Sequence, residues 1–532
     1  MRRFSSYGPV DPESHYHAPR EGLIERGLTQ LIGEGPADGG HYITVWGPRQ
    51  TGKTWVMRQV LWQLQKDERF DVVKVNLQIV GQDFVKTIRY IIEKIAHQLK
   101  ISLPLSADIE QFEKLFTPDY LAKPLILILD EFDNLSEEVI GQLVQVFRNI
   151  YVARGEQLNL SSGERDYLLH GMALIGVRAV LGVENPRGSP FNVQRSMHIP
   201  NLTKNEVIGM FDWYQRETGQ PIEPDVVERI FYETQGQPGL TCWFGELLTE
   251  KEEFNKSLDE PITMAKFDFM YMWATYGLPN NNIQNLISKA REEPYKGTVL
   301  EMFRTDEKMP FSYDDPYFNF LYLNGVVDVE QTPKGLYAKY PCPFVQKRLF
   351  NYFSRELFPQ VGQLHDPFDD MSNTITETSL NIENLLQRYG VYLAENRDWL
   401  LQDVPRRVDL RIYEAVYHFN LYMYLVKFLQ GYDSHVYPEF PTGNGKIDLI
   451  IKHAGKMYGL EVKSFSNQYG YDKGLIQAAK YGQKLGLSEI TLGLFVEAVD
   501  EANRKKYEVV YQDTDTGVTV KPVFVVIGSR KG

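Results

Sequence analysis

A loop rich in glycine carries the first group of residues whose types and spacing could do chemistry. Residues 47–54 read Gly-Pro-Arg-Gln-Thr-Gly-Lys-Thr and fit the pattern GxxxxGK[ST], after a predicted strand and at the start of a predicted helix. In this context backbone N–H groups and the positive helix end bind phosphate oxygens. Lys53 is expected to reach the β- and γ-phosphates, and the Thr54 hydroxyl to hold Mg²⁺. The residues expected at this phosphate site are Gly47, Gln50, Thr51, Gly52, Lys53 and Thr54.

Two carboxylates follow a strongly apolar run further along the chain. Residues 125–129 read Leu-Ile-Leu-Ile-Leu, which predicts a buried strand, and Asp130 and Glu131 come directly after it. At the carboxyl end of such a strand, Asp130 can hold the hydration shell of Mg²⁺ and Glu131 can polarise the attacking water. Asp130 alone would favour a binding switch, whereas the adjacent Glu131 favours hydrolysis of the nucleotide.

Three arginines are candidates for contacts with a γ-phosphate. Arg178 follows the strand predicted at 172–176, and Arg187 and Arg195 are candidate arginine fingers that act on a neighbouring subunit. A surface salt bridge for Arg178 and solvated charges for the other two are the alternative interpretations. These arginines alone do not indicate an oligomer. A homo-oligomer is expected because ATPases of this class often assemble into one.

A second group of chemically capable residues lies in the last hundred or so positions of the sequence. Residues 443–463 predict two strands around a tight turn at Ala454-Gly455. Counting outward from the turn places Asp448 opposite Glu461, with their Cβ atoms about 5 Å apart. Lys463 lies two positions beyond Glu461 and projects from the same face. One turn therefore brings two carboxylates and an amine together.

Two opposed carboxylates repel each other unless a cation lies between them. Mg²⁺ or Mn²⁺ could be held by Asp448, Glu461 and the carbonyl of Val462, because these ions prefer hard oxygen ligands. Such a metal lowers the pKa of a bound water and stabilises charge on a scissile phosphate. Lys463 could orient that water or offset the phosphate charge. A β-hairpin with solvated surface charges is the alternative interpretation.

The segments on either side of this hairpin bear on the site. Residues 410–429 are apolar on nearly all sides, which predicts a buried helix whose Glu414 needs a partner. Gln477 and Tyr481 share one face of a later predicted helix. Arg406, Arg407 and Arg411 precede the buried helix and could contact phosphate, or could serve a domain interface or a solvated surface.

Length and composition predict a packed chain of several domains. The 532 residues exceed one hydrophobic core, and the hydrophobic content of 43% is ordinary for globular proteins. The net charge of −13 limits nucleic-acid contacts to local patches. The two cysteines form no metal-binding motif, and no signal peptide or membrane span is apparent, which together predict a cytoplasmic protein.

Alternating apolar and amphipathic runs predict an α/β multi-domain fold that begins with a P-loop NTPase domain built on a parallel sheet. Strands are expected at 41–46, 71–77, 125–129 and 172–176, and helices at 53–65 and 83–99. Thr203 and Glu206 have the spacing of a capping box, which starts a helical lid. The expected domains are an ATPase core at 1–202, the helical lid at 203–261, a winged-helix-like module or structural spacer at 262–355, a linker or helical connector at 356–405, and a C-terminal α/β domain at 406–532.

Two families are suggested by these motifs. The first resemblance is carried by Phe4, residues 8–10, Tyr16, residues 19–20, the loop at 47–54, residues 189–193 and residues 236–238. Together they resemble bacterial AAA-like ATPase domains related to the STAND class, which implies an ATP-driven switch or assembly and places residues 16–20 near the adenine.

The hairpin with Asp448, Glu461 and Lys463 resembles the PD-(D/E)xK nuclease superfamily, which implies a restriction-endonuclease-like fold at 406–532. Ile447 stands where that motif usually has proline, and the metal ligands are unaffected. In this family a helical glutamate such as Glu414 joins the metal site. A helix with the pattern QxxxY, here Gln477 and Tyr481, supports the site or contacts the substrate.

The function expected from both resemblances is an ATP-regulated or ATP-driven metal-dependent nuclease, with DNA as the substrate by analogy and defence or mobile-element biology as the context. Its cofactors would be ATP and Mg²⁺, with Mn²⁺ as an alternative in the nuclease site. A signalling or assembly ATPase whose nuclease-like domain binds without cutting is the competing hypothesis. A translocating motor with an auxiliary nuclease is a third.

Overall fold

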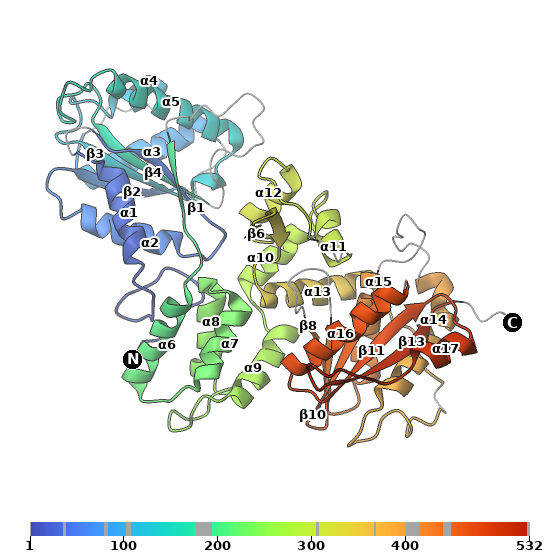
Figure 1. The fold of residues 1–532 in the computed structure, drawn as a ribbon. Coiled ribbons are helices and arrows are strands. Elements are labelled where there is room, and N and C mark those ends of the chain that lie inside the picture. The colour runs from blue at the N-terminus through green and yellow to red at the C-terminus, as the bar shows by residue number, and fades with distance from the viewer. Residues whose placement is uncertain are drawn as a thin grey trace. The chain divides into compact units, whose positions relative to one another are not determined.

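The computed structural model describes residues 2–35, 39–78, 83–102, 108–176, 194–304, 308–366, 369–400, 414–439, 448–465 and 467–528. These residues form two compact units, which are described one at a time (Figure 1). The first unit comprises Met1–Lys289 and Ser312–Val327, and the second comprises Ala290–Phe311 and Asp328–Gly532. Residues of the segment 262–355 therefore occur in both units.

The first unit is built on a parallel sheet of five strands. The strands are β1 (Tyr42–Trp46), β2 (Asp71–Asn76), β3 (Leu125–Asp130), β4 (Leu169–Gly176) and β5 (Gln194–His198), in the order β2-β3-β4-β1-β5. All neighbouring pairs run parallel. The carboxyl ends of β1, β3 and β4 therefore meet at one edge of the sheet, where open α/β sheets bind their ligands.

Helices cover both faces of this sheet. Ile126 and Ile128 of β3 belong to the core formed with α1 (Glu21–Ile32) and α2 (Lys53–Leu64). Leu125, Leu127 and Leu129 belong to the core on the opposite face. The helices of that second core are α3 (Phe84–Leu99), α4 (Ile109–Lys114) and α5 (Glu137–Gly155). Burial on both faces explains why the sequence of β3 is uniformly apolar.

The strands and helices that the sequence predicts for this unit are confirmed with small shifts of their ends. The largest shift is in β4, which begins at Leu169 and so includes a polar residue, His170, that does not fit an apolar run. The helix predicted from position 83 begins at Phe84, because Asp83 caps it by accepting a hydrogen bond from the Lys86 N–H.

His170 belongs to a buried polar cluster at the amino end of β4. Its Nδ1 lies 2.6 Å from Ser162 Oγ, and its Nε2 lies 2.8 Å from the carbonyl oxygen of Ile32. The Arg154 guanidinium donates to Ser162 Oγ at 2.7 Å. Burial lowers the pKa of His170 to about 4, and nearby arginines add to this effect. The imidazole is therefore neutral in the folded protein at neutral pH.

We expect the first unit to lose stability as pH falls from about 6.5 to about 4. The unfolded chain protonates its histidine near pH 6.5, whereas the folded chain resists protonation until pH 4. The unfolded state thus binds more protons in this window, which lowers the free energy of unfolding by roughly 3 kcal/mol. Urea unfolding between pH 4 and pH 7.5 measures the effect, and His170→Asn provides the control because it does not titrate. Equal pH slopes for both proteins would contradict the prediction.

Helices follow the sheet in the first unit. They are α6 (Lys204–Thr218), α7 (Pro224–Thr234), α8 (Pro238–Glu250), α9 (Met264–Tyr276), the start of α10 (Asn281–Ala290) and α12 (Pro316–Leu323). The capping box at the start of α6 is confirmed, since Thr203 and Glu206 exchange side-chain and backbone hydrogen bonds.

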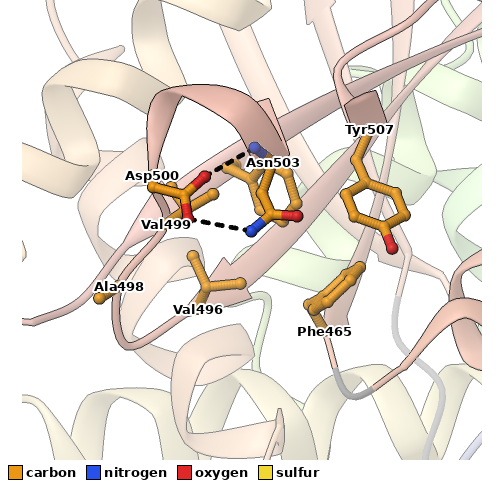
Figure 2. A pocket seen from close by; sticks show the side chains of 8 residues that line it. Phe465, Val496, Ala498, Val499, Asp500, Asn503 and Tyr507 are labelled. Atoms are coloured by element: carbon orange, nitrogen blue, oxygen red, sulfur yellow. Dashed lines mark hydrogen bonds between the residues drawn. The ribbon is translucent and has the colours of Figure 1, made fainter. Parts of the chain in front are cut away.

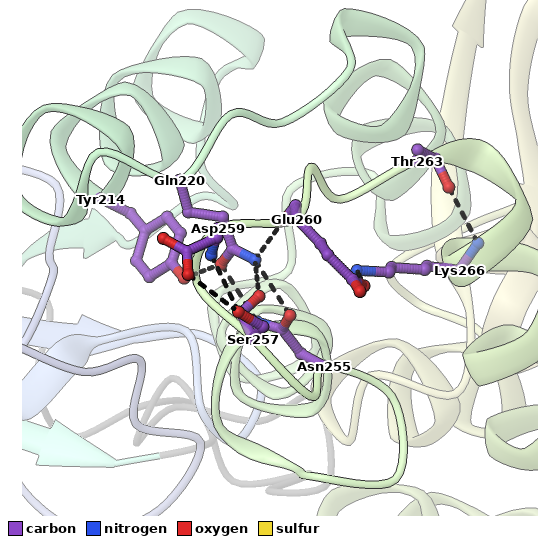
Figure 3. A network of polar contacts seen from close by, with 8 residues as sticks. All are labelled: Tyr214, Gln220, Asn255, Ser257, Asp259, Glu260, Thr263 and Lys266. Atoms are coloured by element: carbon purple, nitrogen blue, oxygen red, sulfur yellow. Dashed lines mark hydrogen bonds and ion pairs between the residues drawn. The ribbon is translucent and has the colours of Figure 1, made fainter.

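A buried glutamine organises the connections among these helices (Figure 3). The fully buried Gln220 accepts a hydrogen bond from Tyr214 and donates to Asn255 Oδ1 at 2.9 Å. It also donates to the carbonyl oxygens of Ser257 and Glu260, at 3.0 and 2.7 Å. One side chain thereby holds the loop between α8 and α9 against the end of α6.

We expect Gln220→Leu to destabilise the first unit by about 3 kcal/mol, because buried acceptors and the Tyr214 hydroxyl would lose their partners. The matched control is Lys266→Ala, which removes an ion pair with the exposed Glu260 at 2.9 Å. That change should cost less than about 0.5 kcal/mol. Thermal unfolding measures both, and similar melting temperatures for the two variants would contradict the prediction.

The second unit is built on a mixed sheet of six strands. They are β8 (Ser434–Glu439), β9 (Asp448–His453), β10 (Lys456–Ser464), β11 (Glu489–Val496), β12 (Tyr511–Gln512) and β13 (Thr519–Val526), in the order β12-β13-β11-β10-β9-β8. β10, β11 and β13 run parallel, whereas β8, β9 and β10 pair antiparallel.

Each face of this mixed sheet packs against different helices. Leu492 and Leu494 of β11 belong to the core formed with α16 (Gln468–Lys484). Phe495 projects from the other face and stacks on Tyr417 of α15 (Glu414–Phe428), with ring centroids 4.6 Å apart. The remaining elements of the unit are α11 (Lys296–Arg304), the hairpin of β6 (Asp328–Thr332) and β7 (Gly335–Lys339), α13 (Pro343–Leu357), α14 (Ile382–Leu400), α15 (Glu414–Phe428) and α17 (Glu501–Tyr507).

Helix α15 is buried on nearly all sides, as its apolar sequence predicts. Its described part begins at Glu414, so the expected start at position 410 and the three arginines Arg406, Arg407 and Arg411 lie outside the described residues.

Among the helices that the structure describes, none has the length and apolar character needed to cross a membrane.

Candidate functional site

A cavity of about 430 Å³ lies over the carboxyl ends of β1, β3 and β4 in the first unit. Its lining includes every residue of the segment 5–10, together with Arg49, Gln50, Gly52, Lys53, Thr54, Asp130, Glu131, Asn134, Gly176, Pro238, Gly239, Asn281 and Asn282. The glycine-rich loop and the carboxylate pair, which are far apart in sequence, thus share one cavity. Its volume is suitable for a small ligand such as a nucleotide.

The loop takes the shape that a phosphate site needs. Gly52 has a φ of 89°, a left-handed conformation that favours glycine, and it is the N-cap residue of α2. Lys53 Nζ donates to the carbonyl oxygens of Gly47 and Pro48 at 2.7 and 2.8 Å. Burial lowers the pKa of Lys53 to about 8, against the opposing effect of nearby carboxylates. The ammonium therefore remains mainly protonated at neutral pH, beside the loop carbonyls.

The two carboxylates have different environments. Asp130 is almost fully buried, and its Oδ2 lies 2.7 Å from Lys74 Nζ of β2. Its Oδ1 accepts a hydrogen bond from the Glu131 N–H at 3.1 Å. Glu131 is half-buried, and burial raises its pKa, with further raising effects from Asp130 and Asp133. A raised pKa makes Glu131 a better proton acceptor.

Two other residues of the loop bind protein groups through their side chains. Thr51 Oγ1 donates to the Pro48 carbonyl at 3.0 Å, and Gln50 Nε2 donates to the Ser6 carbonyl at 3.1 Å. The Gln50 carbonyl in turn accepts from the Gly239 N–H at 3.2 Å. Their side chains therefore hold the loop in place, and a phosphate contact from either residue would come through its backbone N–H.

The remaining candidates of this unit lie elsewhere. Arg178, Arg187 and the motif at 189–193 lie outside the described residues. Arg195 is exposed on the edge strand β5, where it lies 3.5 Å from Gln30 Oε1. Tyr16 packs in an aromatic cluster with Phe4 and Trp213 and is not part of the cavity lining.

Several residues of the cavity carried no signal in the sequence. Asn281 and Asn282 reach it from the start of α10, far along the chain. Asn282 is 5% exposed and makes no side-chain hydrogen bond within the described ranges. Close behind the loop, a Cβ placed on Gly325 would lie only 2.8 Å from Pro48 Cβ, which shows how tightly the segment after α12 packs there. In the sequence, the only unusual property of Lys74 is that it is a charged residue within a predicted strand.

The hairpin in the second unit has the register that the sequence predicts. Asp448 pairs with Glu461, and Ala454 and Gly455 occupy the turn with φ angles of 48° and 74°. Both carboxylates are 4% exposed. Lys463 Nζ lies 3.3 Å from Glu461 Oε1. Two buried acidic side chains and one cation thus project from one face of the sheet.

The donor set fits a hard divalent cation, since carboxylate and carbonyl oxygens are the ligands that Mg²⁺ and Mn²⁺ prefer. The carbonyl oxygen of Val462 lies 3.3 Å from His418 Nε2 of α15, which fixes its position. Glu414 is the first residue of α15, and its side chain is outside the described residues. Among the side chains that the structure describes, no group of three or more His, Cys, Asp or Glu residues is arranged as a complete metal site.

Helix α16 covers the same face of the sheet as these side chains. A Cβ placed on Gly474 would lie 3.8 Å from Lys463 Cδ, so the start of the helix packs against the lysine stem. Further along, Tyr481 is buried and Gln477 is half-buried, one helical turn apart. Both lie on the helix next to the hairpin, and their role remains a prediction.

Residues 37–161 match the model of the AAA domain family. The matched segment contains β1, the phosphate-binding loop, β3 with Asp130, and Glu131 directly after β3. This part of the chain is therefore an AAA-like P-loop ATPase domain, a class that binds ATP, typically with Mg²⁺. No curated protein shows significant similarity to the chain.

Solved structures give distant similarities. The Walker-type ATPase PABY2304 of Pyrococcus abyssi has 14% identity and a TM-score of 0.41, covering 65% of this chain and 99% of that one. Cdc6p from Pyrobaculum aerophilum has 19% identity and a TM-score of 0.35, covering 66% and 97%. The Aeropyrum pernix ORC1 protein, solved in complex with DNA, has 14% identity and a TM-score of 0.33, covering 62% and 92%. Similarity at this level does not define a function.

Proposed function

We propose that this protein is an ATP-regulated, metal-dependent nuclease that acts on DNA. The observation that carries the proposal is the register of the hairpin, which sets the buried Asp448 opposite the buried Glu461 and beside Lys463. Burial of two like charges side by side is costly without compensation. A divalent cation bound by both carboxylates would reduce this cost.

Each residue of this site would have a distinct task. Asp448, Glu461 and the Val462 carbonyl would hold Mg²⁺ or Mn²⁺, with Glu414 as a further ligand. The metal supplies a bound water of lowered pKa and stabilises negative charge on phosphate. Lys463 lies close enough to Glu461 to orient that water and to offset the charge of the scissile phosphate. Gln477 and Tyr481 would support this arrangement from α16.

ATP regulation is supported by the path of the chain at the nucleotide cavity. Helix α10 begins with Asn281 and Asn282 in the cavity lining and ends with Ala290, where the second unit begins. The chain leaves the first unit again just after Gly325, which packs on the loop residue Pro48. Two of the three chain connections between the units, after Lys289 and after Val327, therefore follow closely on residues that line the nucleotide cavity or pack on its loop.

The proposal is tested with a panel of single- and double-stranded DNA and RNA in Mg²⁺ or Mn²⁺. Each substrate is incubated without nucleotide, with ATP and with a non-hydrolysable analogue. Cleavage of DNA that needs the metal and changes with ATP is the expected result. Absence of cleavage under every condition would overturn the nuclease and favour an ATPase switch whose second unit only binds its target.

A variant of α10 tests the regulatory part. We expect Asn282→Ala to weaken ATP binding by about five- to tenfold, because one hydrogen bond to a charged ligand would be lost. Fluorescent nucleotide titration measures the affinity, and the ratio of cleavage with and without ATP should fall toward one. Gln284→Ala is the matched control, since Gln284 is exposed on the same helix. Unchanged affinity in Asn282→Ala would contradict the prediction.

A further inference from the structure

A second cavity, of about 470 Å³, lies in the second unit at the carboxyl ends of β10 and β11 (Figure 2). It is lined by Phe465, Val496, Ala498, Val499, Asp500, Asn503, Tyr507 and Phe524. No part of the mechanism proposed above uses these residues. The first of them directly follows β10, the strand of Glu461 and Lys463.

This cavity opens on the same face of the sheet as the candidate metal site. Glu461, Lys463 and Phe465 alternate along one extended segment and therefore project from one face. Phe465 packs against the core formed with α16, and the stem of Lys463 lies against α16 as well. At about 3.3 Å per residue, the Cα atoms of Lys463 and Phe465 are roughly 7 Å apart. A nucleic acid bound at Lys463 would therefore pass close to the cavity.

The cavity walls are aromatic and aliphatic. The ring of Phe465 lies with its centroid 5.1 Å from that of Tyr507 and 5.4 Å from that of Phe524. Val496 and Val499 complete the apolar lining. Rings of this kind bind the flat faces of nucleobases by stacking, at about 1–3 kcal/mol per base.

Polar groups at the rim match the remaining parts of a nucleotide. Asn503 donates from its N–H and its Nδ2 to the carboxylate of Asp500, at 2.7 and 3.2 Å. Its Oδ1 points away from Asp500, on the side of Tyr507 (Figure 2). Lys506 Nζ lies 3.1 Å from Tyr507 Oη and 4.7 Å from the centre of that ring. The Asn503 side chain, whose amide oxygen could bind a base edge, thus lines the cavity, and an ammonium that could bind a phosphate lies beside Tyr507, one of the lining residues.

Three basic residues follow one another in the helix beside the cavity. Arg504, Lys505 and Lys506 are consecutive in α17, between Asp500 and Glu501 at its start and Glu508 just after its end. Arg504 pairs with Glu508 at 3.1 Å, while the two lysines are exposed. Exposed lysines next to stacking residues are the arrangement used to bind single strands.

We propose that this cavity binds an unpaired nucleobase of the substrate strand, with Lys506 beside the neighbouring phosphate. The proposal rests on the proposed nuclease function, which supplies the strand. Because a base in a duplex is stacked and paired, it must leave the helix to enter the cavity. The substrate class is therefore nucleic acid with single-stranded or unpaired positions, and fully paired duplex binds more weakly.

The test uses the full-length protein with oligonucleotides that contain 2-aminopurine, in Ca²⁺ and EDTA in separate series, so that binding is measured apart from cleavage. Entry of the base into the cavity is expected to change the fluorescence of the single-stranded probe. We expect at least tenfold weaker binding of the paired duplex, and a similar loss for the single strand in Ala498→Trp, which fills the cavity. Lys506→Ala should weaken binding about threefold and reduce its salt dependence.

The controls separate this proposal from the proposed function. Lys521→Ala, which removes a partly exposed lysine of β13 that pairs with Glu489 of β11, should bind the probe like the parent protein. Circular dichroism and ATP turnover check that Ala498→Trp is folded. If the parent protein binds the probe, Ala498→Trp does not, and the parent cuts nothing, the cavity assignment stands and the nuclease proposal falls. If DNA is cut while Ala498→Trp binds the probe normally, the cavity assignment is overturned. If a free 2-aminopurine nucleotide bound as tightly as the single-stranded probe, the assignment of the cavity to a base within a strand would be overturned.

Discussion

Replacement of Asp448 by asparagine is expected to reduce DNA cleavage by at least about 10³-fold while leaving ATP turnover unchanged. The substitution preserves size and removes one of two opposed, buried carboxylates. Without that negative charge, the site would lose most of its affinity for Mg²⁺ or Mn²⁺. Cleavage of a labelled oligonucleotide over a range of metal concentrations measures the effect.

Two controls make this result specific. Asp472→Asn changes an exposed carboxylate on α16 and should leave cleavage unaffected. Manganese binding, measured by titration calorimetry, should weaken at the second unit in Asp448→Asn and remain normal in Asp472→Asn. Retained cleavage in Asp448→Asn would show that the hairpin carboxylates are structural and would remove the basis of the nuclease proposal.

The second large effect is expected in the first unit. Glu131→Gln should lower ATP turnover by about 10²- to 10³-fold, because the side chain could no longer accept a proton from the attacking water. Nucleotide affinity should change little, because Lys53 and the loop remain intact. Phosphate release measures turnover, and fluorescent nucleotide titration measures affinity.

The pH dependence of turnover gives a further check on Glu131. Burial and the neighbouring Asp130 raise the pKa of this carboxyl, so turnover should rise with pH through a range above the ordinary glutamate pKa. Glu138→Gln, an exposed change at the start of α5, should keep the parent profile. A parent-like rate in Glu131→Gln would exclude Glu131 as the base.

The parts of the sites that the sequence predicted are those that depend on local structure. The register of Asp448 against Glu461 follows from the position of one turn, and the loop around Lys53 follows from one motif between a strand and a helix. Contacts between distant segments were not predictable in this way. The pairing of Lys74 with Asp130 depends on the neighbouring positions of β2 and β3, and Asn282 reaches the cavity only because of tertiary packing.

The contacts of Tyr16 are another example of tertiary packing that the sequence does not predict. The resemblance alone places residues 16–20 near the adenine, and in the structure the ring of Tyr16 packs against Phe4 and Trp213. The segment 5–10 lines the cavity instead, held there by the hydrogen bond from Gln50 to the Ser6 carbonyl. An apolar pattern predicts that an aromatic residue is buried, but it does not say in which cluster.

Helix α10 also has a mechanical consequence. It contains ten residues and is therefore about 15 Å long at 1.5 Å per residue. Asn282 and Ala290 are about 12 Å apart along this helix, so a tilt of about 10° at Asn282 would displace Ala290 by about 2 Å. A displacement of this size is enough to make or break a hydrogen bond at Ala290. The geometry converts a small difference between two nucleotides into a change of contacts at the other end of the helix.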